Sequence, residues 1–103
     1  MKYGVLLTPE ANQDINDIFH WYELKTKGLG KDFLTQIDNS LKTIQTNHEM
    51  FSMKYKNVRR CLMKRFPHKV FYTVEKNQII ILAVIFGGRD PDWIKKRISQ
   101  KQL

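Results

Sequence analysis

The apolar residues in the first half of the chain recur at the spacing of two amphipathic helices. The stripe of the first helix consists of Ala11, Ile15, Ile18, Phe19 and Tyr22. The stripe of the second consists of Phe33, Ile37, Leu41 and Ile44. Only the short segment "KGLG" separates the two patterns. We therefore expect the helices to pack against each other as an antiparallel hairpin.

The ends of these helices carry local signals. Thr8 followed by Pro9 predicts a helix start, with Thr8 as the N-cap. Gly28 is expected to be a left-handed cap at the end of the first helix, and Gly30 is expected to loosen the turn. The apolar segment "YGVLL" before Thr8 predicts a short N-terminal strand.

The second half of the chain has the patterns of three strands. "VRRCLMKRF" runs to Pro67, "KVFYTVE" alternates, and "QIIILAVIF" is apolar throughout. A strand that is apolar on both faces is expected to be central in its sheet. One face would be covered by the helical hairpin, and the other by the C-terminal segment or by another protein. Asp90 before Pro91 predicts a short helix at the end.

These elements predict an α+β fold in the order β-α-α-β-β-β, with a short C-terminal helix. The helical hairpin is expected to pack on one face of a mainly antiparallel sheet. A length of 103 residues corresponds to a single domain, residues 1–103. We expect neither a signal peptide nor a membrane span, because no apolar run is long enough.

The positive charge is concentrated in the second half. Residues 1–50 hold five lysines, no arginine and seven acids, a net charge of −2, whereas residues 51–103 hold thirteen cations and three acids, a net charge of +10. This asymmetry predicts an anionic partner: nucleic acid, an acidic protein segment or an anionic membrane surface. A basic surface without a partner is the alternative. The densest segment, "RRCLMKRFPHKVFYTV", contains no acid and five cations, namely Arg59, Arg60, Lys64, Arg65 and Lys69.

The residues offer little for metal or cofactor chemistry. Cys61 is the single cysteine, so an internal disulfide is excluded and a reducing cytoplasm is the expected location. His20, His48 and His68 are scattered and lack metal-ligand spacing. The segment "GLGK" lacks the spacing of a phosphate-binding loop. We therefore expect no metal and no cofactor.

Four segments, in this order, resemble the RelE/ParE superfamily of toxins from type II toxin–antitoxin systems. They are "TPEANQDINDIFHWY", "VRRCLMKRFPHKVFYTV", "IIILAVIFGGRDP" and "WIKKR". The resemblance covers nearly the whole chain, and its Phe-Pro and Arg-Asp-Pro features favour the ParE branch.

The resemblance implies two alternative functions. ParE-like members are thought to poison DNA gyrase without catalysing a reaction. In that case the residues that bind the target or the antitoxin would be Arg59, Arg60, Lys64, Arg65, Arg89 and Trp93. RelE-like members cut messenger RNA on the ribosome, and the residues that would then act electrostatically are Lys64, Lys69 and Arg89. Phe86 lies where many relatives carry a histidine, and the C-terminal tyrosine or histidine of cutting members is absent, which favours the gyrase poison. A simple nucleic-acid-binding module is a third alternative.

The resemblance also implies a partner. A cognate antitoxin with an acidic, partly disordered C-terminal segment is expected to fold over the basic half as a helix or an added strand, giving a toxin–antitoxin hetero-oligomer. The other partner would be DNA gyrase or, in the alternative, the ribosome with messenger RNA; no membrane partner is expected. Strand alternation predicts Arg60 and Lys64 on one face and Arg59 and Arg65 on the other, with one pair exposed beside Arg89.

Overall fold

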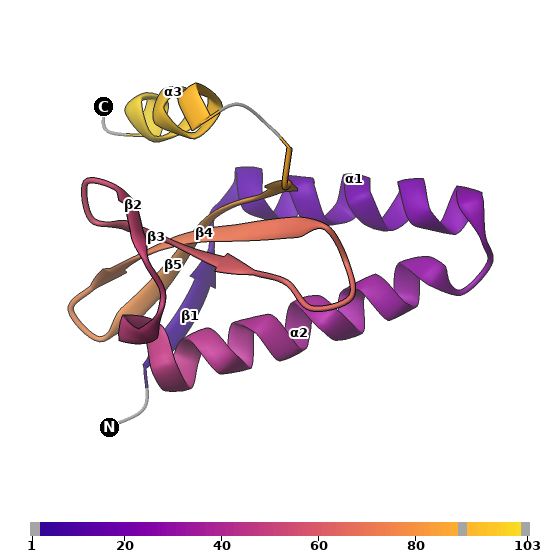
Figure 1. Ribbon diagram of the computed structural model, residues 1–103, viewed down its shortest axis with the longest axis horizontal. Coiled ribbons are helices and arrows are strands. Elements are labelled where there is room, and N and C mark those ends of the chain that lie inside the picture. The colour runs from indigo at the N-terminus through magenta and orange to yellow at the C-terminus, as the bar shows by residue number, and fades with distance from the viewer. Residues whose placement is uncertain (1–2, 89–90, 102–103) are drawn as a thin grey trace.

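The computed structural model describes residues 3–88 and 91–101. Its strands are β1 (Gly4–Leu7), β2 (Met53–Tyr55), β3 (Val58–Leu62), β4 (His68–Glu75) and β5 (Gln78–Phe86) (Figure 1). Its helices are α1 (Pro9–Lys25), α2 (Leu29–Asn47) and α3 (Pro91–Lys101), with a 3-10 turn at His48–Met50. The predicted α+β fold is confirmed, and β2 is an additional strand. No helix within the described ranges has the length and apolarity to cross a membrane.

The five strands form one sheet in the order β1-β5-β4-β3-β2. Strand β1 pairs with β5 in parallel, and the other three pairings are antiparallel. The apolar strand β5 is therefore flanked by a strand on each side, as its sequence predicts.

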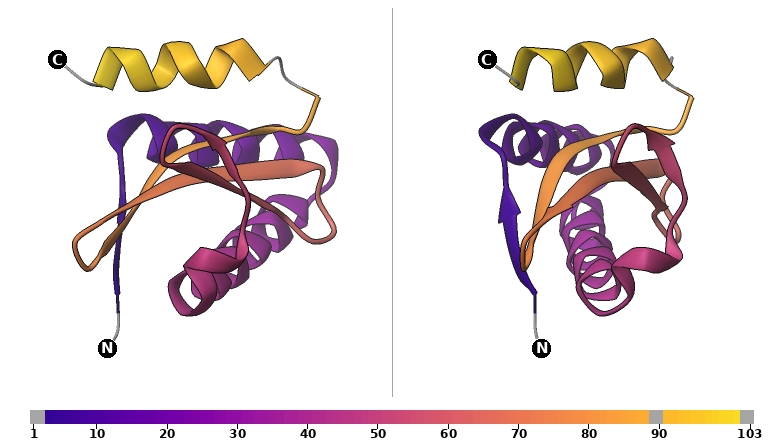
Figure 2. Two further views of the ribbon diagram at one scale, coloured as in Figure 1. Left: turned by 60° about the vertical axis from the view of Figure 1, so that its left-hand side comes forward. Right: turned by 90° about the vertical axis from the view of Figure 1, so that its left-hand side faces the viewer.

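Helices cover both faces of the sheet (Figure 2). The hairpin of α1 and α2 packs on one face, where Phe33, Ile44 and Tyr72 are almost fully buried. Helix α3 packs on the other face through Ile94 and Ile98. The second cover of β5 is thus the C-terminal segment of the chain itself.

A β-bulge in β5 places two adjacent side chains on the same face of the sheet. Phe71 of β4 lies opposite Ala83, and Tyr72 lies opposite Ile81, so Leu82 is the extra residue on β5. Leu82 and Ala83 consequently both join the core beneath α3, although they are adjacent in sequence. Ile81 belongs to the core beneath the helical hairpin.

The start of α1 follows its local sequence, whereas the turn into α2 differs from expectation. The Thr8 Oγ1 accepts a hydrogen bond from the Ala11 N–H at 3.1 Å, which confirms the predicted N-cap. Gly28 is left-handed (φ 89°), as predicted, but it precedes α2. The C-cap of α1 is Thr26. The prediction that Gly28 caps α1 is therefore wrong in its position.

Gly30 brings the two helices together instead of loosening the turn. It is buried within α2, and a Cβ there would lie 2.6 Å from Glu23 Cγ and 2.7 Å from the Phe19 carbonyl oxygen. The Glu23 carboxylate accepts hydrogen bonds from the N–H groups of Gly28 (3.2 Å) and Gly30 (2.8 Å). A side chain of α1 thus caps the first turn of α2. These hydrogen bonds lower the pKa of the Glu23 carboxylate, and the bond from the Gly28 N–H has the largest effect.

The predicted strand "VRRCLMKRF" ends earlier than its pattern suggested. Strand β3 stops at Leu62, and Arg65 adopts φ 70°, which takes the chain out of the sheet before Pro67. Strand β2 has only three residues and pairs with β3 in an irregular register. Its sequence therefore shows no alternation of apolar and polar residues from which the strand could be predicted.

Candidate functional site

The two adjacent arginines of β3 point to opposite faces of the sheet. Arg59 lies opposite Tyr72, on the face of the helical hairpin. Its Nη1 donates hydrogen bonds to the carbonyl oxygens of Glu49 (3.2 Å) and Phe51 (2.6 Å). Arg59 therefore fastens the 3-10 turn to the edge of the sheet, which gives this candidate binding residue a structural role.

Arg60 lies on the α3 face and has a different environment. It is half-buried opposite Phe71, and its Nε is buried without a hydrogen-bond partner. Lys69 lies opposite Leu62 on the same face of the sheet. Arg60 and Lys69 are thus diagonal neighbours on adjacent strands, a spacing within reach of one another for long side chains.

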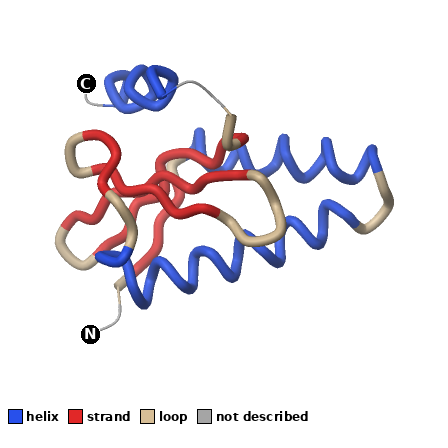
Figure 3. Tube along the Cα trace, viewed as in Figure 1, coloured by secondary structure: helices blue, strands red, loops and turns tan. Residues whose placement is uncertain are grey.

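Lys64 and Arg65 lie in the turn between β3 and β4 (Figure 3). Both are exposed, whereas Arg59 and Arg60 are half-buried. The predicted division into an exposed pair and a covered pair is wrong, because alternation stops with the strand at Leu62. The predicted position of Arg89 beside them lies outside the described residues.

Trp93 takes part in the fold. It is half-buried, packs against the core beneath α3, and has the Arg97 guanidinium carbon 4.4 Å from its ring centroid. The candidate site residues are therefore not gathered in one place: Arg60, Lys64, Arg65 and Lys69 occupy one end of β3 and β4, and Trp93 belongs to α3.

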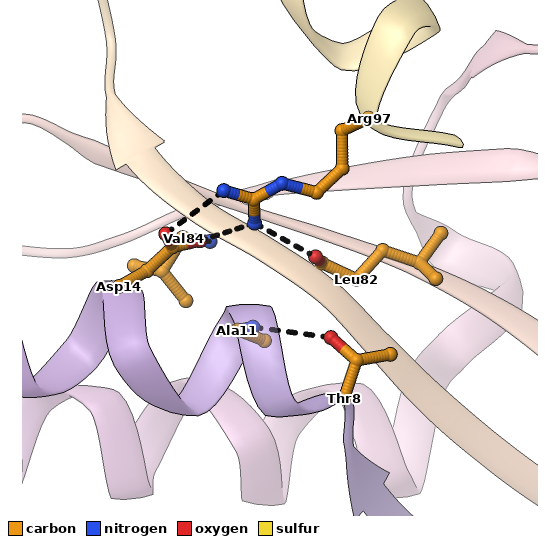
Figure 4. Close-up of polar contacts among 6 residues, drawn as sticks. All are labelled: Thr8, Ala11, Asp14, Leu82, Val84 and Arg97. Carbon is orange, nitrogen blue, oxygen red and sulfur yellow. Dashed lines mark hydrogen bonds and ion pairs between the residues drawn. The ribbon is translucent and has the colours of Figure 1, made fainter. Parts of the chain in front are cut away.

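An ion pair that the sequence did not reveal fastens α3 (Figure 4). Arg97 donates hydrogen bonds to both carboxylate oxygens of Asp14, Nη1 to Oδ2 at 2.7 Å and Nη2 to Oδ1 at 3.1 Å. Arg97 Nη1 also donates to the Leu82 carbonyl oxygen at 3.2 Å, and Asp14 Oδ2 accepts from the Val84 N–H at 3.0 Å. The pair therefore supplies hydrogen-bond partners to backbone groups of β5 that lie beyond the last residue paired with β1. The residues lie 83 positions apart, and the only local signal is that each precedes a buried isoleucine.

His68 is enclosed by aromatic rings at the end of the sheet. It is only 6% exposed, and its ring centroid lies 5.3 Å from that of Phe33 and 5.8 Å from those of Tyr22 and Phe86. Burial lowers the pKa of His68, and its Nδ1 has no hydrogen-bond partner. In the sequence His68 is one of three scattered histidines, and no pattern indicates this enclosure. Phe86 itself is 56% exposed, so an apolar ring faces solvent here.

A groove runs between α2 and the outer edge of β3. Its volume is about 510 Å³, and its lining residues include Ser40, Thr43, Phe51, Cys61 and Leu62. The side chains of Met50, Met53 and Leu62 are exposed at or near it.

The edge of β3 is open beside this groove. The Arg60 N–H points outward to the Ser52 carbonyl oxygen, whereas the Met63 N–H points inward to the His68 carbonyl oxygen. By alternation the backbone groups of Leu62 also point outward, beyond the last residue that β2 covers. This edge can accept another strand.

Comparison with known proteins finds similarity both to a sequence family and to solved structures. Residues 5–91 match the family model described as "ParE toxin of type II toxin-antitoxin system, parDE". A chain of the solved structure "Chromosomal ParDE TA system from P. aeruginosa" has a similar fold, with a TM-score of 0.73 and 18% sequence identity over 82% of this chain and 95% of that chain. No curated protein matches the sequence significantly.

Proposed function

Because this chain belongs to the family of ParE toxins of type II toxin–antitoxin systems, we propose that it stops growth in the cytoplasm by poisoning DNA gyrase. In this proposal the toxin binds its target and catalyses no reaction of its own. A cognate antitoxin binds the toxin and neutralises it.

The observation that carries the gyrase proposal is the exposed ring of Phe86 at the end of β5. Cutting messenger RNA requires proton transfer to and from oxygen atoms of the scissile phosphate. A phenyl ring cannot transfer a proton, and His68 beside it is buried with its pKa lowered. Lys69, which lines a hollow with Phe86, and Lys64 in the turn between β3 and β4 contribute positive charge, which suits binding of an anion as well as catalysis.

The groove between α2 and β3 supports the antitoxin proposal. It combines the exposed apolar side chain of Met50 with an open backbone edge at Leu62. Lys64 adds positive charge at its end. An extended segment with apolar and acidic residues would pair with the edge, fill the groove and neutralise the lysine. The antitoxin would then form a hetero-oligomer with the toxin.

Controlled expression in growing cells tests the gyrase proposal. Gyrase poisoning breaks chromosomal DNA, so we expect filamentous cells with an induced DNA-damage response while translation continues. Immediate arrest of translation without DNA damage would contradict the proposal. That result would favour the ribosome-dependent nuclease, with Lys64, Lys69 and Arg89 acting on the phosphate.

Co-expression with the product of the neighbouring gene tests the antitoxin proposal. The two proteins are expected to co-purify, and the complex is expected to melt at a higher temperature than the toxin. A partner that binds only the folded state adds about 2.7 kcal/mol when its free concentration is about 100 times Kd. An unchanged melting temperature with the candidate antitoxin in excess would reject that partner.

A further inference from the structure

The cations of the basic half differ in their contacts. Arg59 and Arg97 donate hydrogen bonds to other parts of the chain. Several others form neither an ion pair nor a side-chain hydrogen bond within residues 3–88 and 91–101, and four of these lie on β3, β4 and the turn between them: Arg60, Lys64, Arg65 and Lys69. Their positive charge is therefore not used to hold the fold.

These four cations surround one open part of the sheet. Arg60 and Lys69 lie on the α3 face, and Leu62, opposite Lys69 on that face, is 58% exposed, so α3 does not cover this end. Lys64 and Arg65 lie in the turn that joins the same two strands. The segment 58–74 contains no acid that could neutralise them. We name Arg60, Lys64, Arg65 and Lys69 the cationic end of the sheet.

On the α3 face the cationic end provides charge without an exposed aromatic ring, because Phe86, the exposed ring near Lys69, lies opposite His68 and so on the hairpin face. Phe71 lies between Arg60 and Lys69 on the same face, but it is only 5% exposed. Proteins that bind single strands combine cations with exposed aromatic rings, whereas contacts to a duplex backbone need only cations placed along the phosphates. An acidic peptide would find its apolar and backbone contacts in the groove beside α2 instead.

We propose that the cationic end binds the phosphate backbone of double-stranded DNA directly, with Arg60 and Lys69 as its central contacts. Arg60 is suited to this role because it is half-buried on the sheet and its Nε has no internal hydrogen-bond partner. A guanidinium can bind phosphate through two parallel hydrogen bonds. The toxin would then touch the DNA that gyrase holds, as well as the enzyme, and would do so without sequence preference.

Fluorescence anisotropy of a short labelled duplex, measured over a series of salt concentrations, tests the proposal without gyrase. The variant R60Q/K69Q removes two charges from the cationic end. The matched control K27Q/K76Q removes two exposed charges from the helical turn and the β4–β5 turn. We expect R60Q/K69Q to bind about tenfold more weakly or worse, with the slope of log K against log salt reduced by about 2. The control is expected to keep the wild-type slope.

Three results would overturn this assignment. One is absence of duplex binding at low salt, and another is equal weakening by both variant pairs, which would show an effect of net charge alone. The third is tighter binding to single-stranded RNA or to a polyglutamate peptide than to the duplex. Thermal melts of both variants establish that the fold is intact. Because gyrase is absent, failure of DNA binding and failure of gyrase inhibition are separate outcomes.

Discussion

Asp14 of α1 and Arg97 of α3 form a bidentate ion pair across the free edge of β5. Their side chains are 16% and 15% exposed, and together they bind the backbone at Leu82 and Val84. This one pair links the first helix, the last helix and the bulged strand, so it holds α3 over the apolar face of the sheet.

Arg97→Ala is expected to destabilise the protein by about 3 kcal/mol, because removing one partner of a largely buried pair leaves the other charge without compensation. Urea unfolding measures the change. Asp38→Asn, which breaks the exposed pair of Asp38 with Lys42, serves as the control and is expected to cost less than about 1 kcal/mol. Equal effects of the two substitutions would show that the Asp14–Arg97 pair does not hold α3.

Gly30→Ala is expected to destabilise the helical hairpin although alanine favours helices. The gain in helix propensity is about 1 kcal/mol. The new Cβ would lie 2.7 Å from the Phe19 carbonyl oxygen, a backbone atom that cannot move without shifting α1. Such overpacking costs about 1–3 kcal/mol, so we expect a net loss in the free energy of unfolding. A more stable variant would mean that the helices can separate freely at this point.

The pH dependence of stability is expected to report His68. Its pKa is lowered in the folded state from an ordinary value of 6.5, because burial disfavours the charged imidazole. The unfolded chain therefore binds more protons below pH 6.5, and the contribution of His68 to stability, full above that pH, is lost as the pH falls toward the lowered pKa.

Urea unfolding between pH 7 and pH 5 measures this effect. His68→Leu is expected to flatten the curve over that window relative to the wild-type protein. An identical pH profile in the variant would assign the dependence to carboxylates instead.

The Cys61 thiol is expected to be unreactive in the folded protein. Burial raises its pKa to about 11, so little thiolate is present near pH 8. Reaction with a disulfide reagent should therefore be slow in buffer and rapid in denaturant. A native rate equal to that of the unfolded chain would show that the groove beside α2 opens readily.

The features that the sequence predicted are those set by neighbouring residues. The helical stripes, the Thr8 cap and the apolar strand β5 depend on spacing along the chain. The Asp14–Arg97 pair and the packing of Gly30 depend on residues that meet only after folding, so local patterns are not sufficient to predict them.

The candidate site shows the same division. The basic segment was evident from composition, but Arg59 and Arg60 have the same side chain and adjacent positions. Only the register of β3 against β4 shows that Arg59 supports the 3-10 turn while Arg60 faces the open end of the sheet. Because β3 ends at Leu62, Lys64 and Arg65 lie outside the strand, and both are exposed.

The most direct test of the account uses purified toxin in two parallel reactions, gyrase with relaxed plasmid and ribosomes translating a defined messenger. We expect supercoiling to be inhibited and linear plasmid to accumulate after the gyrase is digested, while the messenger stays intact. Adding the cognate antitoxin should restore supercoiling. Undisturbed supercoiling together with cuts in the messenger at fixed codon positions would contradict the account and identify the toxin as a ribosome-dependent nuclease.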